Sequence, residues 1–294
     1  MRVFVTGSSA QLARALLPRL CAHPGVVQVT GVDIAPPHFA HPKFSAIALD
    51  TRASQLAHHM DNHNILINLA FRVLRGRMSE TAMFDINING GHKVFHAARA
   101  AGVARLIHVS SAAVYGIGEN LCEDAPLAPL PGFLYGQHKA RLEQWLTAEF
   151  PQCLRLRPHV ILGPNAQPLL KWLLRQPFHL RLSEPVPRLQ CVHEQDVADA
   201  VLLAMQSDAR GALNLAAADS FSFRDAVRAR HRASLPLPVP LARAALGAAW
   251  KLTGWGGEPA WIDGLARNLT LDCSRAQREL GWHSRHSAAQ LLQS

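Results

Sequence analysis

The chain has 294 residues, of which 49% are hydrophobic and 17% charged, and it carries a formal net charge of +9. This length suits one large domain or two modest lobes, and the composition is typical of a globular enzyme and excludes a disordered chain. We expect no transmembrane helix, because no uninterrupted apolar run approaches about 20 residues, and no secretory leader, because a strand-like run begins at once. Five dispersed cysteines without a C-x-x-C pair indicate reduced thiols and therefore a cytoplasmic location.

The positive charge raises the question of a nucleic-acid or membrane partner. Its densest patch, Arg224–Arg232, has no interleaved aromatic residue on which bases could stack, so we interpret it as a solvated helix face and expect no nucleic-acid partner. His59 and His63 are spaced for one helix face, but apart from Asp61 no third ligand stands at a metal-motif spacing. We therefore expect no metal site.

The N-terminal residues predict a strand, a tight turn and a helix. Residues 2–7 form a short apolar run that ends at Gly7, and leucines share one face of the helix that follows. Free N–H groups and the helix dipole make such a turn an anion site that suits a phosphate. A second apolar run, residues 26–34, ends with Asp33, which is placed to accept hydrogen bonds from ribose hydroxyls and to repel a 2′-phosphate. No arginine follows closely, which favours NAD over NADP.

The most informative stretch for chemistry is Tyr135-Gly136-Gln137-His138-Lys139. The apolar positions predict a helix over residues 135–150, which places Tyr135 and Lys139 one turn apart on a shared face. A cation within about 4–6 Å of a phenol lowers its pKa and can make it a general base, while a hydroxyl of the upstream pair Ser110-Ser111 could hold a substrate oxygen. Taken alone, this spacing is common by chance and more often marks a partly buried tyrosine beside a solvated lysine.

The number and order of these motifs resemble an extended or atypical short-chain dehydrogenase/reductase of the NAD-dependent epimerase/dehydratase family. The family's Thr-Gly-x-x-Gly-x-x-Gly turn falls on Thr6–Ala13, and its strand-end acids fall on Asp33 and Asp50. Further segments match the family's fourth strand, its Asn-x-Asn-Gly helix, its active-site serine strand and its later motifs; these are residues 65–70, 87–90, 106–116, 157–164, 192–198 and 280–282. The resemblance covers most of the chain.

This resemblance implies an α/β fold with a Rossmann-type doubly wound parallel sheet, together with a set of functional residues. The implied catalytic residues are Ser111, Tyr135 and Lys139, with Lys139 lowering the pKa of the tyrosine. The implied NAD-binding residues are Gly7, Ser9, Ala10, Gln11, Leu12, Asp33, Asp50, Thr51, Leu69, Ala70, Asn87, Val109, Tyr135, Lys139, Pro158 and Val160. Family members often dimerise through the helices near residues 87–101 and 135–150, so a homodimer is expected by analogy.

Two departures from the family pattern bear on the ligands. Ala10 and Ala13 replace the second and third glycines of the turn, where a methyl group could weaken pyrophosphate binding. Sugar-nucleotide members carry an asparagine at the place of Val160 and an arginine at the place of Leu189, although Arg188 is adjacent. Because both changes remove polar contacts to a diphosphate, we expect a small-molecule substrate that is not a nucleotide sugar.

The pattern divides the chain into an NAD-binding domain, residues 1–164, and a smaller C-terminal substrate-binding lobe, residues 165–294, from which residues of about 190–216 return to the main sheet. The proline-rich run 235–240 predicts an extended linker. The apolar stretch Leu241–Trp255 is expected to cover the substrate cleft, and its Trp250 and Trp255 would suit a lipophilic substrate. A helix lying on a membrane surface is the alternative for this stretch.

The expected function is hydride transfer between NAD and a secondary alcohol or ketone, with Ser111, Tyr135 and Lys139 handling the oxygen and its proton. Ala112 and Ala113 stand where dehydratases of the family often carry an acidic pair, so dehydration by that route is not expected. A sugar-nucleotide epimerase is one alternative. The other is a non-catalytic dinucleotide-binding sensor or assembly protein, which the two turn alanines suit and the triad argues against.

Overall fold

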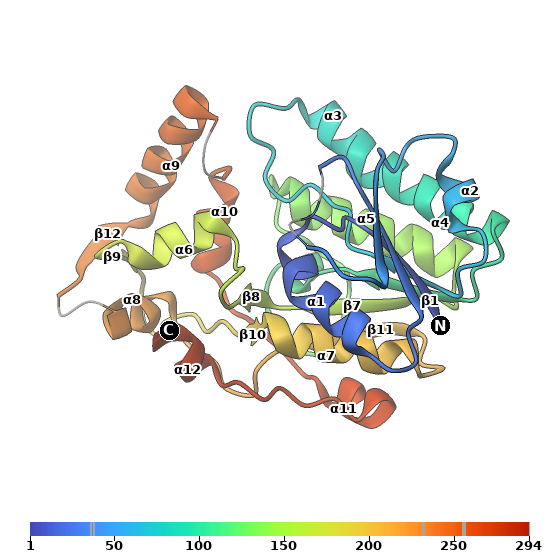
Figure 1. Ribbon diagram of the computed structural model, residues 1–294. Coiled ribbons are helices and arrows are strands. Elements are labelled where there is room, and N and C mark those ends of the chain that lie inside the picture. Colours follow the sequence, from blue (N-terminus) through green and yellow to red (C-terminus); the bar gives the residue numbers. More distant parts are fainter. Residues whose placement is uncertain (36, 38, 231–232, 255–256, 294) are drawn as a thin grey trace.

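A seven-stranded parallel sheet forms the centre of the computed structural model, which describes residues 1–35, 37, 39–230, 233–254 and 257–293 (Figure 1). Every pairing between neighbouring strands of this sheet is parallel. From one edge to the other the strands are β11 (Gly211–Leu215), β7 (Leu154–Pro158), β5 (Arg105–Val109), β4 (Ile65–Asn68), β1 (Arg2–Thr6), β2 (Gln28–Asp33) and β3 (Phe44–Ala48). The predicted doubly wound α/β fold is confirmed.

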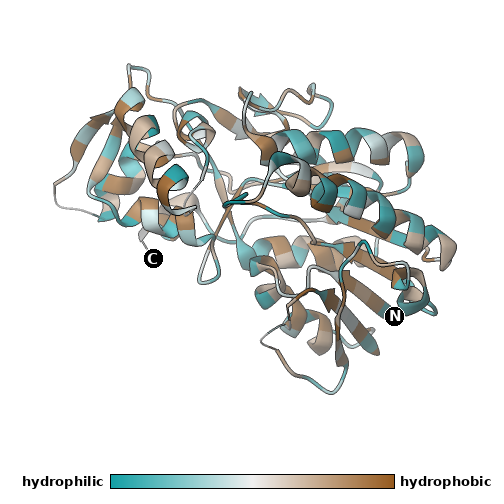
Figure 2. Cartoon of the chain, turned by 90° about the horizontal axis from the view of Figure 1, so that it is seen from above, coloured by the Kyte–Doolittle hydropathy of each residue, from teal (hydrophilic) through white to brown (hydrophobic). Residues whose placement is uncertain are grey.

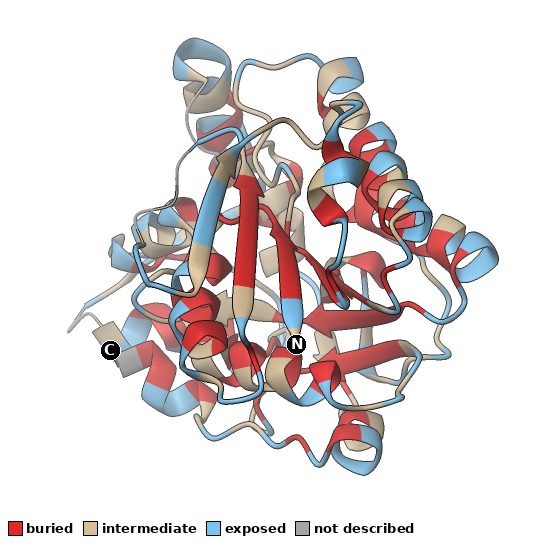
Figure 3. Cartoon of the chain, turned by 45° about the vertical axis from the view of Figure 1, so that its right-hand side comes forward, coloured by how far each residue is buried: buried red, intermediate tan, exposed pale blue. Residues whose placement is uncertain are grey.

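The strands in the middle of the sheet are short apolar runs because both faces of the sheet are covered by helices. Val3, Phe4 and Val5 of β1 are fully buried, as are Leu66 and Ile67 of β4. Figure 3 shows these central strands in red, and Figure 2 shows the same strands coloured mainly as hydrophobic, whereas the helices alternate. A strand that is buried on both sides has no polar face, which explains why its sequence shows no alternation.

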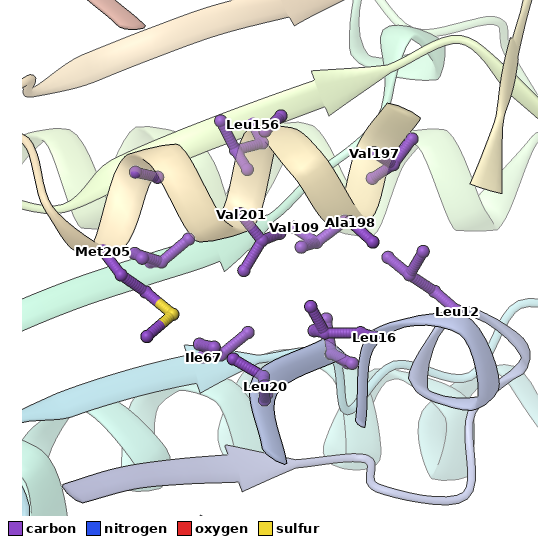
Figure 4. Packing of buried hydrophobic residues seen from close by; sticks show 14 of the residues in the cluster. Leu12, Leu16, Leu20, Ile67, Val109, Leu156, Val197, Ala198, Val201 and Met205 are labelled. Atoms are coloured by element: carbon purple, nitrogen blue, oxygen red, sulfur yellow. The ribbon is translucent and has the colours of Figure 1, made fainter. Parts of the chain in front are cut away.

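Successive residues of each strand point to opposite faces, so each face has its own core. On one face the cluster combines β-strand residues with α1 (Gln11–Ala22), α7 (Glu194–Met205) and α11 (Ser274–Leu280). Figure 4 shows Leu16 and Leu20 of α1 and Val201 of α7 converging on Ile67 and Val109 of the sheet. The other face packs against α2 (Leu56–Met60), α4 (Gly90–Ala100) and α5 (Leu134–Glu149).

The remaining elements near the carboxyl ends of the strands are short. The helix α3 (Glu80–Phe84) runs into a π-helical turn, Asp85–Asn89, and then into α4, and a 3-10 turn, Ala112–Val114, follows β5. Two small parallel pairs lie beside the main sheet, β6 (Gly118–Leu121) with β13 (Leu269–Leu271) and β8 (Val160–Leu162) with β10 (Cys191–His193). Parallel strands share one carboxyl edge, which is where ligands bind in such sheets.

A second cluster of buried residues forms a lobe beside this edge, on the left in Figure 1. Its elements are α6 (Pro168–Arg175), β9 (Phe178–Arg181), α8 (Phe223–Arg230), β12 (Leu235–Pro238), α9 (Val239–Thr253), α10 (Ala260–Leu265) and α12 (Ala288–Gln293). The chain passes between sheet and lobe repeatedly: α7 and β11 return to the sheet after α6 and β9, and α11 returns after α10. The domain boundary at residue 164 remains a prediction.

Two details differ from the predictions. The run 235–240 is not a linker, because β12 pairs in parallel with β9 and Leu235 N donates to Pro177 O. Its prolines are tolerated because the sheet has only two strands, so each strand is an edge, and Pro240 falls in the first turn of α9. In the segment 190–216, β11 joins the main sheet and α7 packs on it, but β10 pairs with β8 instead.

Candidate active site

The turn after β1 is open to an anion. Gly7 has a φ of +75°, and a Cβ atom there would lie 2.5 Å from Ala70 N, so only glycine fits between β1 and the end of β4. The helix α1 then begins at Gln11 without a side-chain cap and without an acidic residue in its first turn. The buried hydroxyl of Ser8 has no hydrogen-bond partner. Uncapped N–H groups and an unused hydroxyl at a helix N-terminus fit a pyrophosphate.

Asp33 lies beside this turn at the end of β2. Its Oδ2 accepts a hydrogen bond from Ser9 N at 3.0 Å, and its Oδ1 accepts one from Ala35 N at 3.3 Å. These bonds hold the carboxylate at the carboxyl edge of the sheet, next to the phosphate-type turn, as binding of a ribose requires. Pro36, which follows in the sequence, lies outside the described residues.

Asp50 and Thr51 lie on the same side, after β3. The guanidinium of Arg52 pairs with Asp50 at 2.5 Å and with Asp85 at 2.6 Å. The hydrogen bonds from Arg52 lower the pKa of the Asp50 carboxyl. Thr51 Oγ1 lies against Gly90 at the start of α4. Arg52 is therefore engaged by two carboxylates, so it is poorly placed to bind a 2′-phosphate.

The three predicted catalytic side chains come together beyond the ends of β4 and β5. Tyr135 and Lys139 occupy consecutive turns at the start of α5, as the sequence predicts. The Nζ of Lys139 donates to Val109 O at 2.7 Å and lies 3.8 Å from the centroid of the Phe71 ring. The hydroxyl of Ser111 accepts from Ala113 N at 3.2 Å and is also hydrogen-bonded to the Tyr135 phenol.

The protonation preferences of this pair differ from the expectation. Burial raises the pKa of Tyr135 to about 12, although the hydrogen bond with Ser111 opposes the rise. Burial lowers the pKa of Lys139 to about 7, against the attraction of Glu143. The Lys139 ammonium lies 5.9 Å from the centroid of the Tyr135 ring and faces Val109 O and Phe71 instead. Desolvation therefore outweighs any acidifying effect of the lysine on the phenol in this structure.

A cavity of about 300 Å³ connects the phosphate-type turn with these three side chains and continues to the lobe. Ten of the predicted site residues line it, namely Ala10, Gln11, Leu12, Leu69, Val109, Ser111, Tyr135, Lys139, Pro158 and Val160. The other predicted residues do not line the cavity; they are Gly7, Ser9, Asp33, Asp50, Thr51, Ala70 and Asn87. Apart from Asn87, these belong to the turn or to the strand ends where the adenosine half of a dinucleotide is expected.

Asn87 does not line the cavity but contacts the loop that carries Phe71, a cavity residue. Its Oδ1 accepts from Arg72 N at 2.7 Å, and its Nδ2 donates to Arg72 O at 3.0 Å and contacts His138 Nδ1 at 3.2 Å. Arg72 directly follows Phe71, whose ring covers the Lys139 ammonium. Asn87 therefore fixes the loop that shields the lysine from water.

Several cavity walls were not anticipated from the sequence. They are aromatic or aliphatic side chains from the loop before α5 and from the lobe, namely Leu130, Phe133, Leu169, Leu170, Leu173, Trp261 and Leu265. The Phe133 and Trp261 rings meet edge to face, with centroids 5.0 Å apart. The helical spacing of Leu169 and Leu173 was the available signal, but nothing in the sequence places that helix against the triad.

The predicted cover of the cleft is in the wrong place. The helix α9 contributes no residue to the cavity walls, whose lobe side includes residues of α6 and α10. Trp250 of α9 instead donates from Nε1 to Gly76 O at 2.9 Å, and the Arg75 guanidinium lies 4.6 Å from the centroid of its ring. Trp255, and His231 and Arg232 of the basic patch, lie outside the described residues.

A buried ionic network involves a residue of α5 but does not line the triad's cavity. Glu143, which is fully buried, accepts two hydrogen bonds from Arg157 Nε at 3.0 Å and one from Arg157 Nη2 at 2.6 Å. Arg157 Nη1 also donates to the Tyr115 hydroxyl, which in turn donates to Asn214 Oδ1 at 2.8 Å. The network joins α5, β7 and β11, and Glu143 stands one turn after Lys139.

Two further predictions concern ligands and membranes. His63 is buried, and its Nε2 lies 2.9 Å from Thr30 Oγ1. Within the described part of the chain there is no group of three or more His, Cys, Asp or Glu residues that could hold a metal ion. Among the same residues, no helix is long and apolar enough to cross a lipid bilayer.

The strand–turn–helix, Asp33 and the clustered Ser111, Tyr135 and Lys139 agree with the match to a family model. The model of the NAD dependent epimerase/dehydratase family matches residues 3–216. The chain belongs to this family. As a member it is an NAD-dependent enzyme, and the turn and Asp33 fit that cofactor.

The chain is similar to two known proteins in sequence and to solved structures in fold. It is 25% identical over 311 aligned positions to the uncharacterized protein y4nG of Sinorhizobium fredii. That alignment covers 98% of this chain and 76% of the relative. It is 30% identical over 186 positions to the 4-hydroxy-2-methyl-3-oxo-4-farnesyl-3,4-dihydroquinoline-1-oxide ketoreductase of Stigmatella aurantiaca, which covers 59% of this chain and 54% of that protein. Its fold is similar to that of a dTDP-glucose 4,6-dehydratase of Streptomyces venezuelae solved with NAD, with a TM-score of 0.75, 18% identity and coverage of 100% and 95% of the two chains.

Proposed function

We propose that this epimerase/dehydratase-family enzyme is an oxidoreductase that interconverts a secondary alcohol and a ketone on a small molecule other than a nucleotide sugar. The observation that carries the proposal is the meeting of Ser111, Tyr135 and Lys139 in one cavity that also reaches the phosphate-type turn. The relative from Stigmatella aurantiaca, a ketoreductase by name, supports the same reaction class.

The residues that would hold the cofactor lie in the turn after β1, at the end of β2 and in the cavity walls. The turn at Gly7–Leu12 would take the pyrophosphate and Asp33 the adenosine ribose, while Pro158 and Val160 border the end of the cavity nearest β7 and β8. When bound, the nicotinamide supplies or accepts the hydride. The chain itself has to place the reacting oxygen and move one proton.

Tyr135 is the residue that we assign to the proton. Because its pKa is raised to about 12, the phenol keeps its proton at neutral pH and can donate it to a carbonyl oxygen. In the reducing direction the carbonyl carbon receives a hydride and the oxygen receives the Tyr135 proton, which solvent then replaces. Ser111, bonded to the same phenol, would hold the oxygen in line. In the oxidising direction the same proton moves from the substrate hydroxyl to a phenolate.

Three residues support the exclusion of nucleotide sugars. Val160 and Leu189 both line the cavity as apolar side chains, at the places where sugar-nucleotide members carry polar ones. Arg188 turns away from the cavity, with Nε 3.2 Å from Ser220 Oγ and Nη1 3.5 Å from Asp225 Oδ2. A nucleotide-sugar epimerase remains the second candidate, because the chain shares its fold with enzymes of that kind.

The test separates binding from chemistry. Calorimetric titration of the protein with NAD and NADP should give NAD binding at least about tenfold tighter, because the Asp33 carboxylate repels a 2′-phosphate. Tyr135→Phe should then bind NAD normally and lose about 10²- to 10⁴-fold in turnover, the range expected for a missing general acid–base group.

Tyr115→Phe is the matched control, because it removes the only other tyrosine hydroxyl from a buried network that does not line the cavity. It should lower stability and leave turnover per folded molecule unchanged. Full turnover by Tyr135→Phe would overturn the assignment, and normal NAD binding by a chain without turnover on any carbonyl compound would favour a non-catalytic sensor.

The location and the assembly are proposed on separate grounds. All five cysteines are free, and Cys21, Cys153 and Cys191 are buried, which supports a reducing, cytoplasmic compartment. A homodimer through α4 and α5 is proposed by analogy with the family, and light scattering on the purified protein would test it. Peripheral membrane contact through α9 also stays a prediction; Leu241 and Leu252 on that helix are exposed.

A further inference from the structure

The part of the cavity that lies beyond the triad is bounded by hydrocarbon. From α6 come Leu169, Leu170 and Leu173, and from α10 come Trp261 and Leu265. The segment before α5 adds Leu130 and Phe133, and the rings of Phe133 and Trp261 pack edge to face. These walls come from three separate parts of the chain, so the apolar character belongs to the cavity as a whole and not to one helix.

The charged and ionisable groups in the walls are already bonded. Among the lining residues of the described chain, Lys139 is the only lysine, Glu194 is the only acidic residue, and none is an arginine. Lys139 is held by Val109 O, and both Glu194 oxygens accept from Asn165, from its N and its Nδ2, each at 2.8 Å.

The neutral polar side chains in the walls are few. His159 Nε2 lies 2.9 Å from Leu269 O, its Nδ1 accepts from Val160 N at 2.7 Å, and burial lowers its pKa to about 4, so it stays neutral. Gln11 and Gln167 are uncharged amides. The buried hydroxyl of Ser110, which also lines the cavity, has no partner and stands next to Ser111. Hydroxyl groups capable of meeting a substrate oxygen are therefore collected at the triad.

We infer that the substrate is an uncharged, largely hydrocarbon ketone or secondary alcohol, with rings or an alkyl chain held between α6 and α10 and its oxygen at Ser111 and Tyr135. This inference rests on the proposed function for the position of the oxygen. A phosphate or carboxylate in the outer part of the cavity would lose its hydration and gain no cationic partner there, whereas each buried methylene is favourable.

The test is a homologous series of 2-alkanones, from 2-butanone to 2-decanone, titrated calorimetrically into the protein saturated with NAD. The dissociation constant should fall about fourfold for each added methylene until the cavity is full. UDP-glucose, at the concentrations at which 2-octanone saturates, should not bind. A flat series, or UDP-glucose binding tighter than every alkanone, would overturn the inference.

Two wall variants locate the effect. Leu173→Asn should weaken binding of 2-octanone about tenfold or more and leave NAD binding unchanged, because it puts an amide into the hydrocarbon wall. Leu252→Asn, the same change at an exposed position of α9, should change neither. Leu170→Asn repeats the wall test if Leu173→Asn fails to fold. Unchanged 2-octanone affinity in a folded wall variant would refute the assignment.

Failure of the inference and failure of the proposed function are distinguishable, because the alkanone series measures binding without turnover. The series can also be run on Tyr135→Phe, where a steep dependence on chain length should persist while turnover is lost. Turnover retained by Tyr135→Phe would remove the proposed chemistry and leave the ligand class standing.

Discussion

Lys139 should make the stability of this protein depend on pH in a way that isolates one side chain. An ordinary lysine has a pKa of 10.5, and burial lowers that of Lys139 to about 7. Between these values the unfolded chain holds a proton that the folded chain has released, so the free energy of unfolding rises with pH by about 1.4 kcal/mol per pH unit from this group. Over the whole interval the contribution amounts to about 5 kcal/mol.

The perturbation is Lys139→Met, which keeps the side-chain length and removes the charge. Below pH 7 the folded wild type carries a buried ammonium, and the variant is spared that cost, so its relative stability should be greatest there. The advantage should shrink steadily between pH 7 and 10.5, by up to about 5 kcal/mol. Hydrogen bonding to Val109 O and the contact with the Phe71 ring are lost at every pH and only shift the whole curve.

The assay is urea unfolding of both proteins at pH 6, 7, 8, 9 and 10, and the quantity compared is the difference between their unfolding free energies at each pH. Other titrating groups cancel in that difference. Lys251→Met is the matched control, because this lysine is exposed on α9 and its ammonium stays in water in both states. A stability difference between Lys139→Met and wild type that is the same at every pH would refute the reasoning.

Three other changes give expected outcomes. Glu143→Gln should lower the free energy of unfolding in urea by about 3–5 kcal/mol, because it leaves the Arg157 guanidinium buried without its carboxylate. Adding Arg157→Met should recover part of that loss, and additive losses of the two substitutions would contradict the network. Gly7→Ala should lower the melting temperature and abolish NAD binding, since its methyl group would lie 2.5 Å from Ala70 N, whereas Gly102→Ala, equally left-handed but with nothing within 4 Å, should cost about 1 kcal/mol and leave NAD binding intact. Asp33→Ser should reduce the calorimetric preference for NAD over NADP at least about tenfold, and an unchanged preference would remove Asp33 from the ribose site.

The sequence predicted the parts of the site that depend on neighbouring residues. The turn at Gly7, the acid at the end of β2 and the one-turn spacing of Tyr135 and Lys139 follow from local periodicity and glycine chemistry. The placement of Ser111 on the same side of the sheet as the Gly7 turn follows from the shared carboxyl edge of parallel strands. These features needed no knowledge of distant contacts.

The parts that were missed depend on contacts between residues far apart in the chain. Nothing in the run 235–240 indicates that it pairs with β9, nearly sixty residues earlier. The apolar stretch of α9 and the shorter α10 look equally able to cover a cleft, and only tertiary packing places Trp261 against Phe133. The upward shift of the Tyr135 pKa is also caused by burial, which a Tyr-x-x-x-Lys spacing does not reveal.

The repeated passage of the chain between sheet and lobe has a mechanical consequence. A lobe joined to a sheet by one chain connection can rotate about that connection. Here several separate connections join the lobe to the sheet. In addition β11 and α11, which follow parts of the lobe in sequence, pack in the sheet and against its face. Rotation of the lobe about one point to open the cavity would strain all of these connections at the same time. The cavity walls are therefore expected to admit ligands by small sliding displacements of α6 and α10, and calorimetry should record one melting transition for the whole molecule.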